Sequence, residues 1–330
     1  MKQKQTMESI LDLGSSFMAS RVFLAGAELD LFTLLAKKSM PVDEIAAEKK
    51  ADRRGMGILL DALCALGLLV KTDGKYRTES SAVRLLTKDS PDSILPMALH
   101  LCTLWQNWSQ LTDIVLGKSS PSMAEQGALA KQNIQAFIGA MHTVASRKAP
   151  EVVNAVNPGK ARRLLDVGGG SGSYTLAFLN AIPDMTATLF DLPEVVEMAR
   201  KRCKKAGVAD RVTLVAGDFY TDELPAGHDL ALLSAIIHQN SLEQNEEIYR
   251  KIYRALDPGG RIVVRDHVMS PDRTEPLDGA LFAVNMLAGT SAGSTYTFGE
   301  IREGLSAAGF GRIRQIQSGG MFSLVEGFRE

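Results

Sequence analysis

The chain has 330 residues, of which 45% are hydrophobic and 23% charged, which is typical of a protein with two domains and a sizeable core. Its 37 basic and 38 acidic residues nearly cancel, so no overall field favours nucleic acid or an anionic membrane surface as a partner. We predict a soluble cytoplasmic protein, because the three cysteines lack metal-ligand spacing, no signal-type segment follows Met1, and no uninterrupted apolar run is long enough to span a bilayer.

The first domain is predicted to cover residues 1–90 and to be mostly helical. Apolar residues recur at helical spacing over Leu11–Leu35, an acidic first turn marks a short helix at Pro41–Ala46, and a third helix follows over Arg53–Leu69. Asp73-Gly74, in the segment after it, is typical of a β-hairpin turn. Helices followed by a hairpin predict a winged helix.

A winged helix raises the alternative of a DNA-binding regulator, whose third helix would present polar and basic side chains to a groove. Here basic residues stand only at the start of that helix, at Arg53 and Arg54. The remainder is apolar on nearly every face: Met56, Ile58, Leu59, Leu60, Leu63, Cys64, Leu66 and Leu68. A helix that is apolar all round is buried in a core or against another subunit, so we expect no nucleic acid partner.

Residues 91–160 are predicted to form a helical connector. Large apolar side chains recur there at helical spacing: Leu99, Leu101, Leu104, Trp105, Trp108, Leu111, Ile114, Phe137, Met141 and Val144. For most of them this spacing indicates packing. The stretch 117–127, rich in Ser and Pro, is predicted to be an exposed loop.

Strands and helices alternate over residues 161–330. The predicted strands are 163–167, 186–191, 212–216, 229–234, 261–266, 312–317 and 321–325. The predicted helices are 174–181, 194–206, 244–255 and 298–307, and Pro258-Gly259-Gly260 is the predicted turn before the fifth strand. This alternation predicts an α/β fold, a doubly wound, Rossmann-like parallel sheet with helices on both faces.

A glycine-rich loop follows the first of these strands. The strand ends at Asp166, and Gly168, Gly170 and Gly172 follow it. Glycine tolerates positive φ and, without a Cβ, lets a ligand lie against the backbone. The next strand ends about twenty residues later at Asp191, where an acid can accept hydrogen bonds from a ribose diol. Together these residues predict a nucleotide-like cofactor at the carboxyl ends of two adjacent strands.

An NAD-dependent dehydrogenase is one alternative, because such enzymes use a similar loop. Three details disfavour it. Tyr174 stands where the dinucleotide pattern requires glycine, and about 160 residues precede the loop, whereas an NAD-binding chain usually opens with it. Gly217-Asp218-Phe219 follows the third strand, which suits an acid beside an adenine amino group and an aromatic ring against the base.

On these residues the chain resembles the S-adenosylmethionine-dependent methyltransferases. It is most similar to the small-molecule O-methyltransferases that include the plant caffeate and acetylserotonin enzymes and many bacterial relatives. The resemblance implies a class I methyltransferase fold, an N-terminal winged-helix dimerisation domain, a homodimer, a connector that roofs the active site, and no metal. The residues that it assigns to S-adenosylmethionine, whose product is S-adenosylhomocysteine, are Asp166, Gly168, Gly170, Gly172, Asp191, Leu192, Asp218, Phe219 and Ser234.

Transfer of a methyl group to a hydroxyl benefits from a general base, and histidine is the usual choice. His238 lies just after the fourth strand, where open α/β sheets bind ligands. In the resembled family the histidine at this point is the base, usually followed by Asp-Trp, which Gln239-Asn240 replaces here. Asp266 ends the fifth strand and matches the acid that orients the base. His267 is expected to point to the other face if the strand continues.

The resembled family often has a second carboxylate, in a Glu-Arg-Thr triplet before the last helix. Thr295 occupies that acidic position here, while Thr297 and Glu300 form a predicted capping box. The base is therefore held by Asp266 alone, or the acceptor differs from the plant phenols.

Candidate acceptor contacts lie in two segments. The connector, as the implied roof, supplies Trp108, Phe137, Met141 and His142, and the segment after the fifth strand supplies Phe282, Asn285, Met286 and Leu287. Aromatic and methionine side chains suit a flat apolar acceptor. We predict an O-methyltransferase acting on an aromatic or related small metabolite. The alternatives are a cofactor-binding relative that methylates carbon or nitrogen or transfers no methyl, and, less favoured, the winged-helix regulator.

Overall fold

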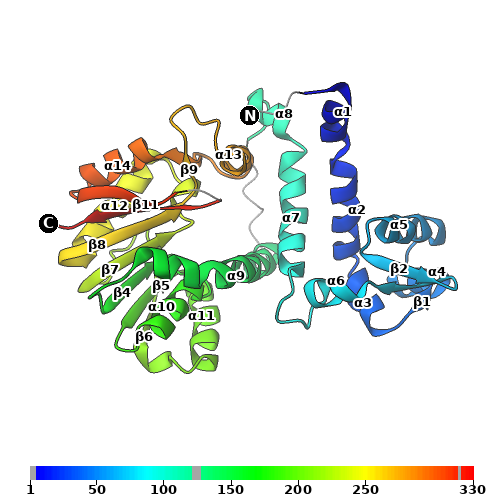
Figure 1. Ribbon diagram of the computed structural model, residues 1–330, viewed down its shortest axis with the longest axis horizontal. Coiled ribbons are helices and arrows are strands. Elements are labelled where there is room, and N and C mark those ends of the chain that lie inside the picture. The colour runs from blue at the N-terminus through cyan, green and yellow to red at the C-terminus, as the bar shows by residue number, and fades with distance from the viewer. Residues whose placement is uncertain (1–4, 121–127, 319–320) are drawn as a thin grey trace. The chain divides into compact units, whose positions relative to one another are not determined.

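The chain divides into two units, Met1–Trp105 and Gln106–Glu330, each with its own hydrophobic core (Figure 1). The computed structural model describes residues 5–120, 128–318 and 321–330. Within the helix that begins at Ala128, the side chains of residues 128–137, 140, 143 and 144 lie outside this description. The predicted loop 117–127 is therefore described only as far as residue 120.

The first unit combines helices with a small antiparallel sheet of order β1-β3-β2. Its helices are α1 Met7–Ser15, α2 Phe17–Glu28, α3 Leu31–Lys37, α4 Val42–Lys49, α5 Arg53–Ala65, α6 Ser80–Leu86 and α7 Leu95–Trp108, which continues into the second unit. Its strands are β1 Met40–Pro41, β2 Leu69–Thr72 and β3 Lys75–Thr78. Asp73 and Gly74, at φ 49° and 71°, form the predicted hairpin turn between β2 and β3.

Residues with left-handed backbone end two helices earlier than predicted. Asp30, at φ 50°, separates α2 from α3, and with a further break after α1 it replaces the single predicted helix Leu11–Leu35 by three. Gly67, at φ 73°, follows α5, which stops at Ala65 instead of Leu69. In both cases the apolar pattern runs on past the helix end, because the residues that follow also pack into the core.

The prediction that the apolar residues of α5 are buried on nearly every face of the helix is wrong. Met56, Leu60 and Leu63 pack into the core, whereas Ile58 is 56% exposed and Leu66 is 42% exposed. One face of the helix is therefore packed within the unit and another is left apolar at the surface.

The prediction that no apolar run is long enough to span a bilayer is wrong for one stretch. Met7–Glu28 has the length and apolar composition of a span, with a mean hydropathy of 1.2, although only 17% of its most apolar window is buried. It is the one such stretch in the described part of the chain, and it is made of α1 and α2. This is weak evidence for a membrane, because apolar helices that pack on another protein surface pass the same test.

The second unit is a three-layer α/β fold around a seven-stranded sheet of order β11-β12-β8-β7-β4-β5-β6. Its strands are β4 Arg163–Val167, β5 Thr186–Asp191, β6 Val212–Ala216, β7 His228–Ser234, β8 Leu256–Asp266, β11 Gly311–Gln317 and β12 Ser323–Phe328, with a separate short pair, β9 Val268–Met269 and β10 Tyr296–Thr297. Strand β12 runs antiparallel to both of its neighbours, so the predicted doubly wound sheet is mixed.

Helices cover both faces of this sheet, as Figure 1 shows. The helices of the second unit, not all of which pack on the sheet, are α8 Leu111–Val115, α9 Ala128–Val156, α10 Ser173–Ala181, α11 Pro193–Lys205, α12 Leu242–Ala255, α13 Leu277–Gly289 and α14 Phe298–Ala307, with 3₁₀ turns at Ala209–Arg211 and Ile237–Gln239. One core joins α12 and α14 to the sheet, and a second joins α9 and α10 to its opposite face. This confirms the predicted α/β layers.

Strand β8 differs from its predicted boundaries. It begins at Leu256, directly after α12, and Pro258-Gly259-Gly260 lies inside it as an irregular stretch and not as a turn before it. Leu256 pairs with His228, and the pairing with β7 shifts register before Leu230. The strand ends at Asp266, as predicted.

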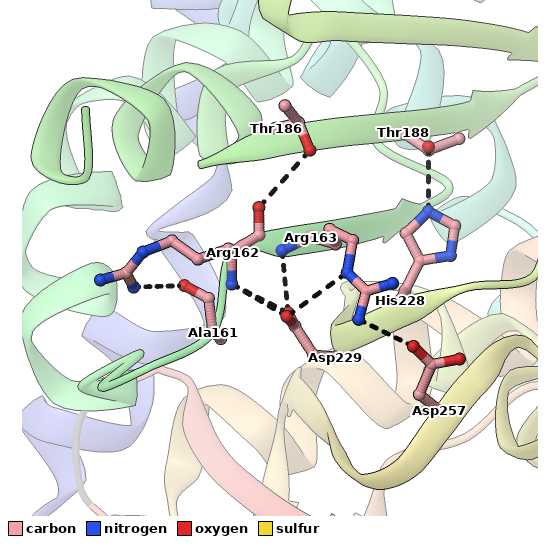
Figure 2. Close-up of polar contacts among 8 residues, drawn as sticks. All are labelled: Ala161, Arg162, Arg163, Thr186, Thr188, His228, Asp229 and Asp257. Carbon is pink, nitrogen blue, oxygen red and sulfur yellow. Dashed lines mark hydrogen bonds and ion pairs between the residues drawn. The ribbon is translucent and has the colours of Figure 1, made fainter. Parts of the chain in front are cut away.

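The amino ends of the strands in the seven-stranded sheet carry a polar network (Figure 2). The Asp229 carboxylate accepts hydrogen bonds from the backbone N–H groups of Arg162 and Arg163, at 3.0 and 2.8 Å. The Arg163 guanidinium pairs with Asp257 at 2.8 Å, and His228 Nε2 lies 2.9 Å from the Thr188 hydroxyl. These groups join the start of β7 to β4 and β5 and the start of β4 to β8.

Candidate active site

The glycine loop has the backbone that its residues predict. Gly168, Gly170 and Gly172 lie at φ 65°, 56° and 78°, a left-handed region that favours glycine. A Cβ on Gly168 would lie 2.6 Å from the Ile236 side chain, whereas a Cβ on Gly170 would meet nothing within 4 Å. The loop is thus held tightly on one side and leaves open space beside Gly170, which fits a cofactor lying against the backbone.

Asp191 ties this loop to the end of β5. Its carboxylate accepts hydrogen bonds from the backbone N–H groups of Gly170 and Leu192, each at 2.7 Å. Burial raises the pKa of Asp191, and these two N–H groups partly offset the rise. The predicted ribose-binding acid therefore stands beside the glycine loop, with Leu192 directly after it.

Asp166 lies buried beneath the loop at the end of β4. The Thr175 hydroxyl, on the first turn of α10, donates a hydrogen bond of 2.6 Å to its carboxylate. Burial raises the pKa of Asp166 to about 6, against the opposing effect of this hydrogen bond, and the neighbouring Asp191 adds to the rise. This is the one predicted cofactor residue whose charge is strongly disfavoured by its surroundings.

The end of β6 supplies the acid and ring predicted for the adenine. Asp218 is half-buried and accepts a hydrogen bond of 2.9 Å from the backbone of Tyr220. The Phe219 ring packs near the loop, its Cε1 lying 3.6 Å from the position of a Cβ on Gly168. The buried Lys251 ammonium binds the backbone carbonyl of Phe219 at 2.9 Å and so fixes the segment.

His238 and Asp266 form a hydrogen-bonded pair at the carboxyl ends of β7 and β8. His238 Nδ1 lies 2.8 and 3.0 Å from the two carboxylate oxygens of Asp266, which is fully buried. Burial raises the pKa of Asp266, but the charge and hydrogen bond of His238 and the backbone N–H of His267 outweigh it, so the pKa falls below its usual value. An ionised carboxylate only accepts hydrogen bonds, so Nδ1 carries the proton and Nε2 is the free nitrogen.

A buried amide chain, not anticipated from the sequence, holds the 3₁₀ turn that carries His238. Asn245 donates a 2.9 Å hydrogen bond to the backbone carbonyl of Ile237, and Asn240 donates one of 2.9 Å to Asn245. The Tyr296 hydroxyl donates to the backbone carbonyl of Asn240. Asn240, one of the two residues that replace the family's Asp-Trp, is therefore part of this support.

The residues predicted to contact the acceptor do not all lie near His238. Phe282 packs edge-on against His238, with ring centroids 4.8 Å apart, and Trp108 Nε1 donates a 2.9 Å hydrogen bond to Asn285. Met286 is buried in α13, and Leu287 is exposed. Met141 is half-buried in α9, and His142 lies 2.7 Å from the Ser173 hydroxyl, beside the glycine loop and not beside His238. The Phe137 side chain lies outside the described residues.

Thr295, predicted to stand at the position of the family's second carboxylate, packs within the second unit. Its side chain is buried and its hydroxyl donates to the Gly279 carbonyl at 3.3 Å, while Arg273 binds its backbone oxygen at 2.7 Å. The Thr297–Glu300 capping box is present as predicted. Asp266 is accordingly the single carboxylate hydrogen-bonded to His238 among the residues that the structure describes.

Two buried groups beside the pair were missed. His267 was expected on the other face, but β8 ends at Asp266 and the His267 ring lies 6.3 Å from that of His238. Arg265 is also buried, with its guanidinium 3.8 Å from the centroid of the Phe322 ring and Nη1 3.3 Å from the Ser234 hydroxyl. It forms no ion pair with a carboxylate in the described part of the chain. The run Arg265-Asp266-His267 was the available signal, since three polar residues end an apolar strand.

Metal ligands are not gathered anywhere in the described ranges. No group of three or more His, Cys, Asp or Glu side chains is arranged to hold a metal ion there.

The mixed seven-stranded sheet, with its glycine loop at the carboxyl ends, is the fold of the class I methyltransferases. A family model of the O-methyltransferase domain matches residues 115–311, and a model of the O-methyltransferase dimerisation domain matches residues 11–88. The chain belongs to the family of S-adenosylmethionine-dependent O-methyltransferases. The predicted family, fold class, enzyme type and cofactor are thereby confirmed.

Proteins that are similar to this chain over nearly its whole length are also O-methyltransferases. The tetracenomycin polyketide synthesis 8-O-methyltransferase of Streptomyces glaucescens is 33% identical over 325 residues, covering 96% of this chain and 95% of the relative. A 3-hydroxy-5-methyl-1-naphthoate 3-O-methyltransferase of Streptomyces sahachiroi is 30% identical, covering 93% and 90%. The crystal structure of human N-acetylserotonin methyltransferase in complex with S-adenosylmethionine superposes with a TM-score of 0.84 at 27% identity and covers 99% of both chains.

Proposed function

We propose that this enzyme methylates a hydroxyl of an aromatic small molecule, with His238 as the general base. The observation that carries the proposal is the His238–Asp266 pair, 2.8 Å apart at the carboxyl ends of β7 and β8 and beside the Phe282 ring. A base oriented by a buried acid is the arrangement that removes a proton from a hydroxyl nucleophile.

The proton path follows from this pair. The Asp266 carboxylate accepts a hydrogen bond from Nδ1–H, which leaves the Nε2 lone pair of His238 to take the proton of the acceptor hydroxyl. The positive charge that develops on the imidazole is stabilised by the ionised Asp266, whose lowered pKa keeps it charged. The amide chain through Asn245 holds the turn and therefore the direction of Nε2.

The chain's own residues account for cofactor binding. S-adenosylmethionine, when bound, supplies an electrophilic methyl group on a sulfonium. We assign its amino-acid portion to the glycine loop with Asp166, its ribose to Asp191 with Leu192, and its adenine to Asp218 and Phe219. Arg265, a buried cation without a carboxylate partner in the described part, with Ser234 beside it, is assigned to the cofactor carboxylate.

An aromatic acceptor suits the side chains around His238. Phe282 offers a ring edge-on to the imidazole, and Trp108 and Asn285 add a ring and an amide joined by one hydrogen bond. The names of the two Streptomyces relatives specify a polyketide and a naphthoate as the compounds that they methylate. We propose Met286, Met141 and Phe137 as further contacts of the acceptor.

The test is methyl transfer from labelled S-adenosylmethionine to a panel of naphthols and dihydroxynaphthalenes, with the product's methylated atom identified by mass spectrometry and NMR. We expect O-methylation, and a fall in kcat of about 10²–10⁴-fold for His238→Gln with cofactor affinity unchanged. Label on a ring carbon would overturn the hydroxyl acceptor. A His238→Gln enzyme of undiminished rate would overturn the general base.

We also propose a homodimer formed through the first unit. The dimerisation-domain match covers residues 11–88, and α1 and α2 carry large exposed apolar side chains: Met7, Ile10, Leu11, Leu13, Phe17 and Met18. A second copy that covers these residues would remove them from water. Light scattering should give twice the monomer mass, and Leu13→Asp with Phe17→Asp should lower it. A monomer at all concentrations would contradict this.

We propose that the dimer works in the cytoplasm. Cys64, Cys102 and Cys203 are free thiols, as expected of a reducing compartment. Fractionation of cells that express the protein should recover it without membranes, and retention of the full chain on membranes after a high-salt wash would contradict this.

A further inference from the structure

His267 is a buried histidine with no hydrogen-bond partner on its ring. The side chain is 2% exposed, and neither Nδ1 nor Nε2 meets a hydrogen-bonding atom among the residues that the structure describes. Buried polar atoms in folded proteins are nearly always paired, because water otherwise offers them a better environment. A ring with both nitrogens unpaired is therefore suited to a partner that is not part of the chain.

The ring lies within the catalytic cluster. Phe282 stacks on His267 with centroids 4.3 Å apart and also packs edge-on against His238 at 4.8 Å. The Phe322 ring also packs against His267, with centroids 4.6 Å apart. Packing between aromatic rings fixes the orientation of the imidazole, as a residue that positions a ligand requires.

Burial keeps the His267 ring neutral. Burial lowers the pKa of the ring to about 4; Asp266 and Asp278 oppose this, and His238 and Arg265 add to it. A neutral imidazole carries one N–H donor and one lone pair, so His267 can donate to or accept from an oxygen but does not serve as a charged anchor.

We propose that His267 positions the acceptor by hydrogen bonding to a second oxygen, ortho or peri to the hydroxyl that faces His238. The preferred acceptors are then aromatic compounds with two neighbouring oxygen functions, such as a hydroxyl beside a second hydroxyl or a carbonyl. This inference rests on the proposed function, because it takes His238 as the base.

The electronic demand of the reaction favours two oxygens over one. The imidazole centroids are 6.3 Å apart, and a hydrogen bond joins nitrogen and oxygen at about 2.8 Å, so two neighbouring oxygens of one acceptor can each reach one of the two rings. The reacting oxygen gives its proton to His238 and needs its lone pair for the new bond to carbon. A hydrogen bond from His267 to that same oxygen would withdraw electron density from it.

Specificity follows from the unpaired nitrogens. An acceptor with a single oxygen leaves the His267 ring without a partner after the site has closed over it, whereas an acceptor with two oxygens satisfies it. Sites built to hydrogen-bond a substrate group discriminate strongly against analogues that lack it.

The kinetic test compares 2-naphthol with 2,3-dihydroxynaphthalene in the full-length enzyme. We expect wild type to prefer the dihydroxy compound at least tenfold in kcat/KM, and His267→Phe, which keeps the aromatic packing, to lose most of that preference while its kcat/KM for 2-naphthol changes less than threefold. His267→Asn, which can still donate and accept, should restore part of the preference. An equal loss on both acceptors would overturn the proposal in favour of a packing role.

A second readout separates this proposal from the proposed function. The ¹⁵N signals of His267 should shift when 2,3-dihydroxynaphthalene binds the S-adenosylhomocysteine complex, and should not shift with 2-naphthol. The expected ¹⁵N shift does not depend on whether either compound is methylated. If the wild-type enzyme transfers no methyl group, that result contradicts the proposed function and leaves the positioning role of His267 to be decided by the ¹⁵N shift. Unshifted His267 signals at a saturating dihydroxy ligand would overturn the positioning role.

His228→Asn is the matched control. His228 is also buried and has an unpartnered Nδ1, but its Nε2 meets Thr188 at the other edge of the sheet. We expect this variant to keep the wild-type preference between the two acceptors. If it loses that preference to the same extent as His267→Phe, the effect does not come from contact with the acceptor.

Discussion

The amino and carboxyl ends of the central strands β4, β7 and β8 carry similar polar residues with different numbers of partners. At the amino ends, the Asp229 carboxylate binds the backbone of Arg162 and Arg163, and the Arg163 side chain pairs with Asp257 (Figure 2). At the carboxyl ends, buried polar groups have fewer partners: Asp166 lies under the loop, Arg265 has no carboxylate partner, and the ring nitrogens of His267 have no hydrogen-bond partner in the described part of the chain.

This difference in pairing distinguishes polar groups that stabilise the fold from polar groups that are available to bind a ligand. The network at the amino ends stabilises the sheet, because its carboxylates and the Arg163 guanidinium already have partners within the protein. Unsaturated groups at the carboxyl ends cost stability in the free protein and regain it when a ligand supplies the missing partners. Substitutions at the two edges should therefore affect different measurements.

The largest effect is expected for Asp266→Asn. The amide no longer stabilises the cation on His238 and can turn its N–H₂ group toward Nδ1, so kcat should fall by about 10²–10³-fold. Steady-state kinetics give the rate, and calorimetric titration with S-adenosylmethionine should give an unchanged affinity. A rate within threefold of wild type would remove Asp266 from the proton path.

The stability of the cofactor-free enzyme should depend on pH through Asp166. Burial raises the pKa of this group from 3.8 to about 6, so the folded state keeps its proton where the unfolded state has lost it, and stability falls as the pH rises from 4 to 6. Relative to Asp166→Asn, wild type should lose about 3 kcal/mol of unfolding free energy between pH 4 and 7. Denaturant unfolding at several pH values measures this, and parallel curves for the two proteins would contradict it.

Substitution of Arg265 should weaken cofactor binding without lowering the stability of the cofactor-free protein. Arg265→Met removes the proposed partner of the cofactor carboxylate, so the Kd of S-adenosylmethionine should rise about 10–100-fold, while the cofactor-free protein should be at least as stable because a buried, unpaired cation is lost.

Arg261→Met is the matched control on the same strand, because Arg261 pairs with the buried Glu326 at 2.5 Å. It should lower the unfolding free energy and leave the Kd unchanged. The reverse pattern in the two variants would remove Arg265 from the cofactor site.

The smallest effect on activity is expected for Asp229→Asn, the counterpart of Asp266→Asn at the opposite edge. The amide keeps one acceptor oxygen but loses the ion pair with Arg163, so the unfolding free energy should fall by about 1 kcal/mol. The kcat of the folded enzyme should stay within twofold of wild type. A rate loss comparable to that of Asp266→Asn would erase the distinction between the edges.

Local sequence patterns predicted the elements that carry the cofactor residues. The boundaries of β4, β5 and β6 agree with the structure to the residue, because each is a short apolar run bounded by glycine or an acid. The His238–Asp266 pair joins the ends of two adjacent strands: strand positions placed both residues at the carboxyl ends of the sheet, and the family resemblance supplied their roles. The helix break at Asp30 was not predicted, because its cause is a single backbone angle inside an apolar pattern.

The neighbours of His267 and Arg265 could not be predicted in the same way. The aromatic rings that pack on these two residues belong to Phe282 on α13 and Phe322 before β12. Both segments are distant in sequence from β8 and reach its end only in the folded chain. The burial of these two polar residues is a tertiary property, and neither periodicity nor motif spacing reports it.

The antiparallel strand β12 determines when the site can complete its folding during synthesis of the chain. Residues Ser323–Phe328 pair with β8 from Asp266 back to Arg261 and lie between β8 and β11. While the chain is being synthesised, β8 has a partner on one side only, and the strand that ends at Asp266 stays an open edge until this last strand emerges. A ribosome-bound chain that stops before Ser323 should therefore contain the glycine loop and His238 and still be unable to fix the carboxylate that orients the base.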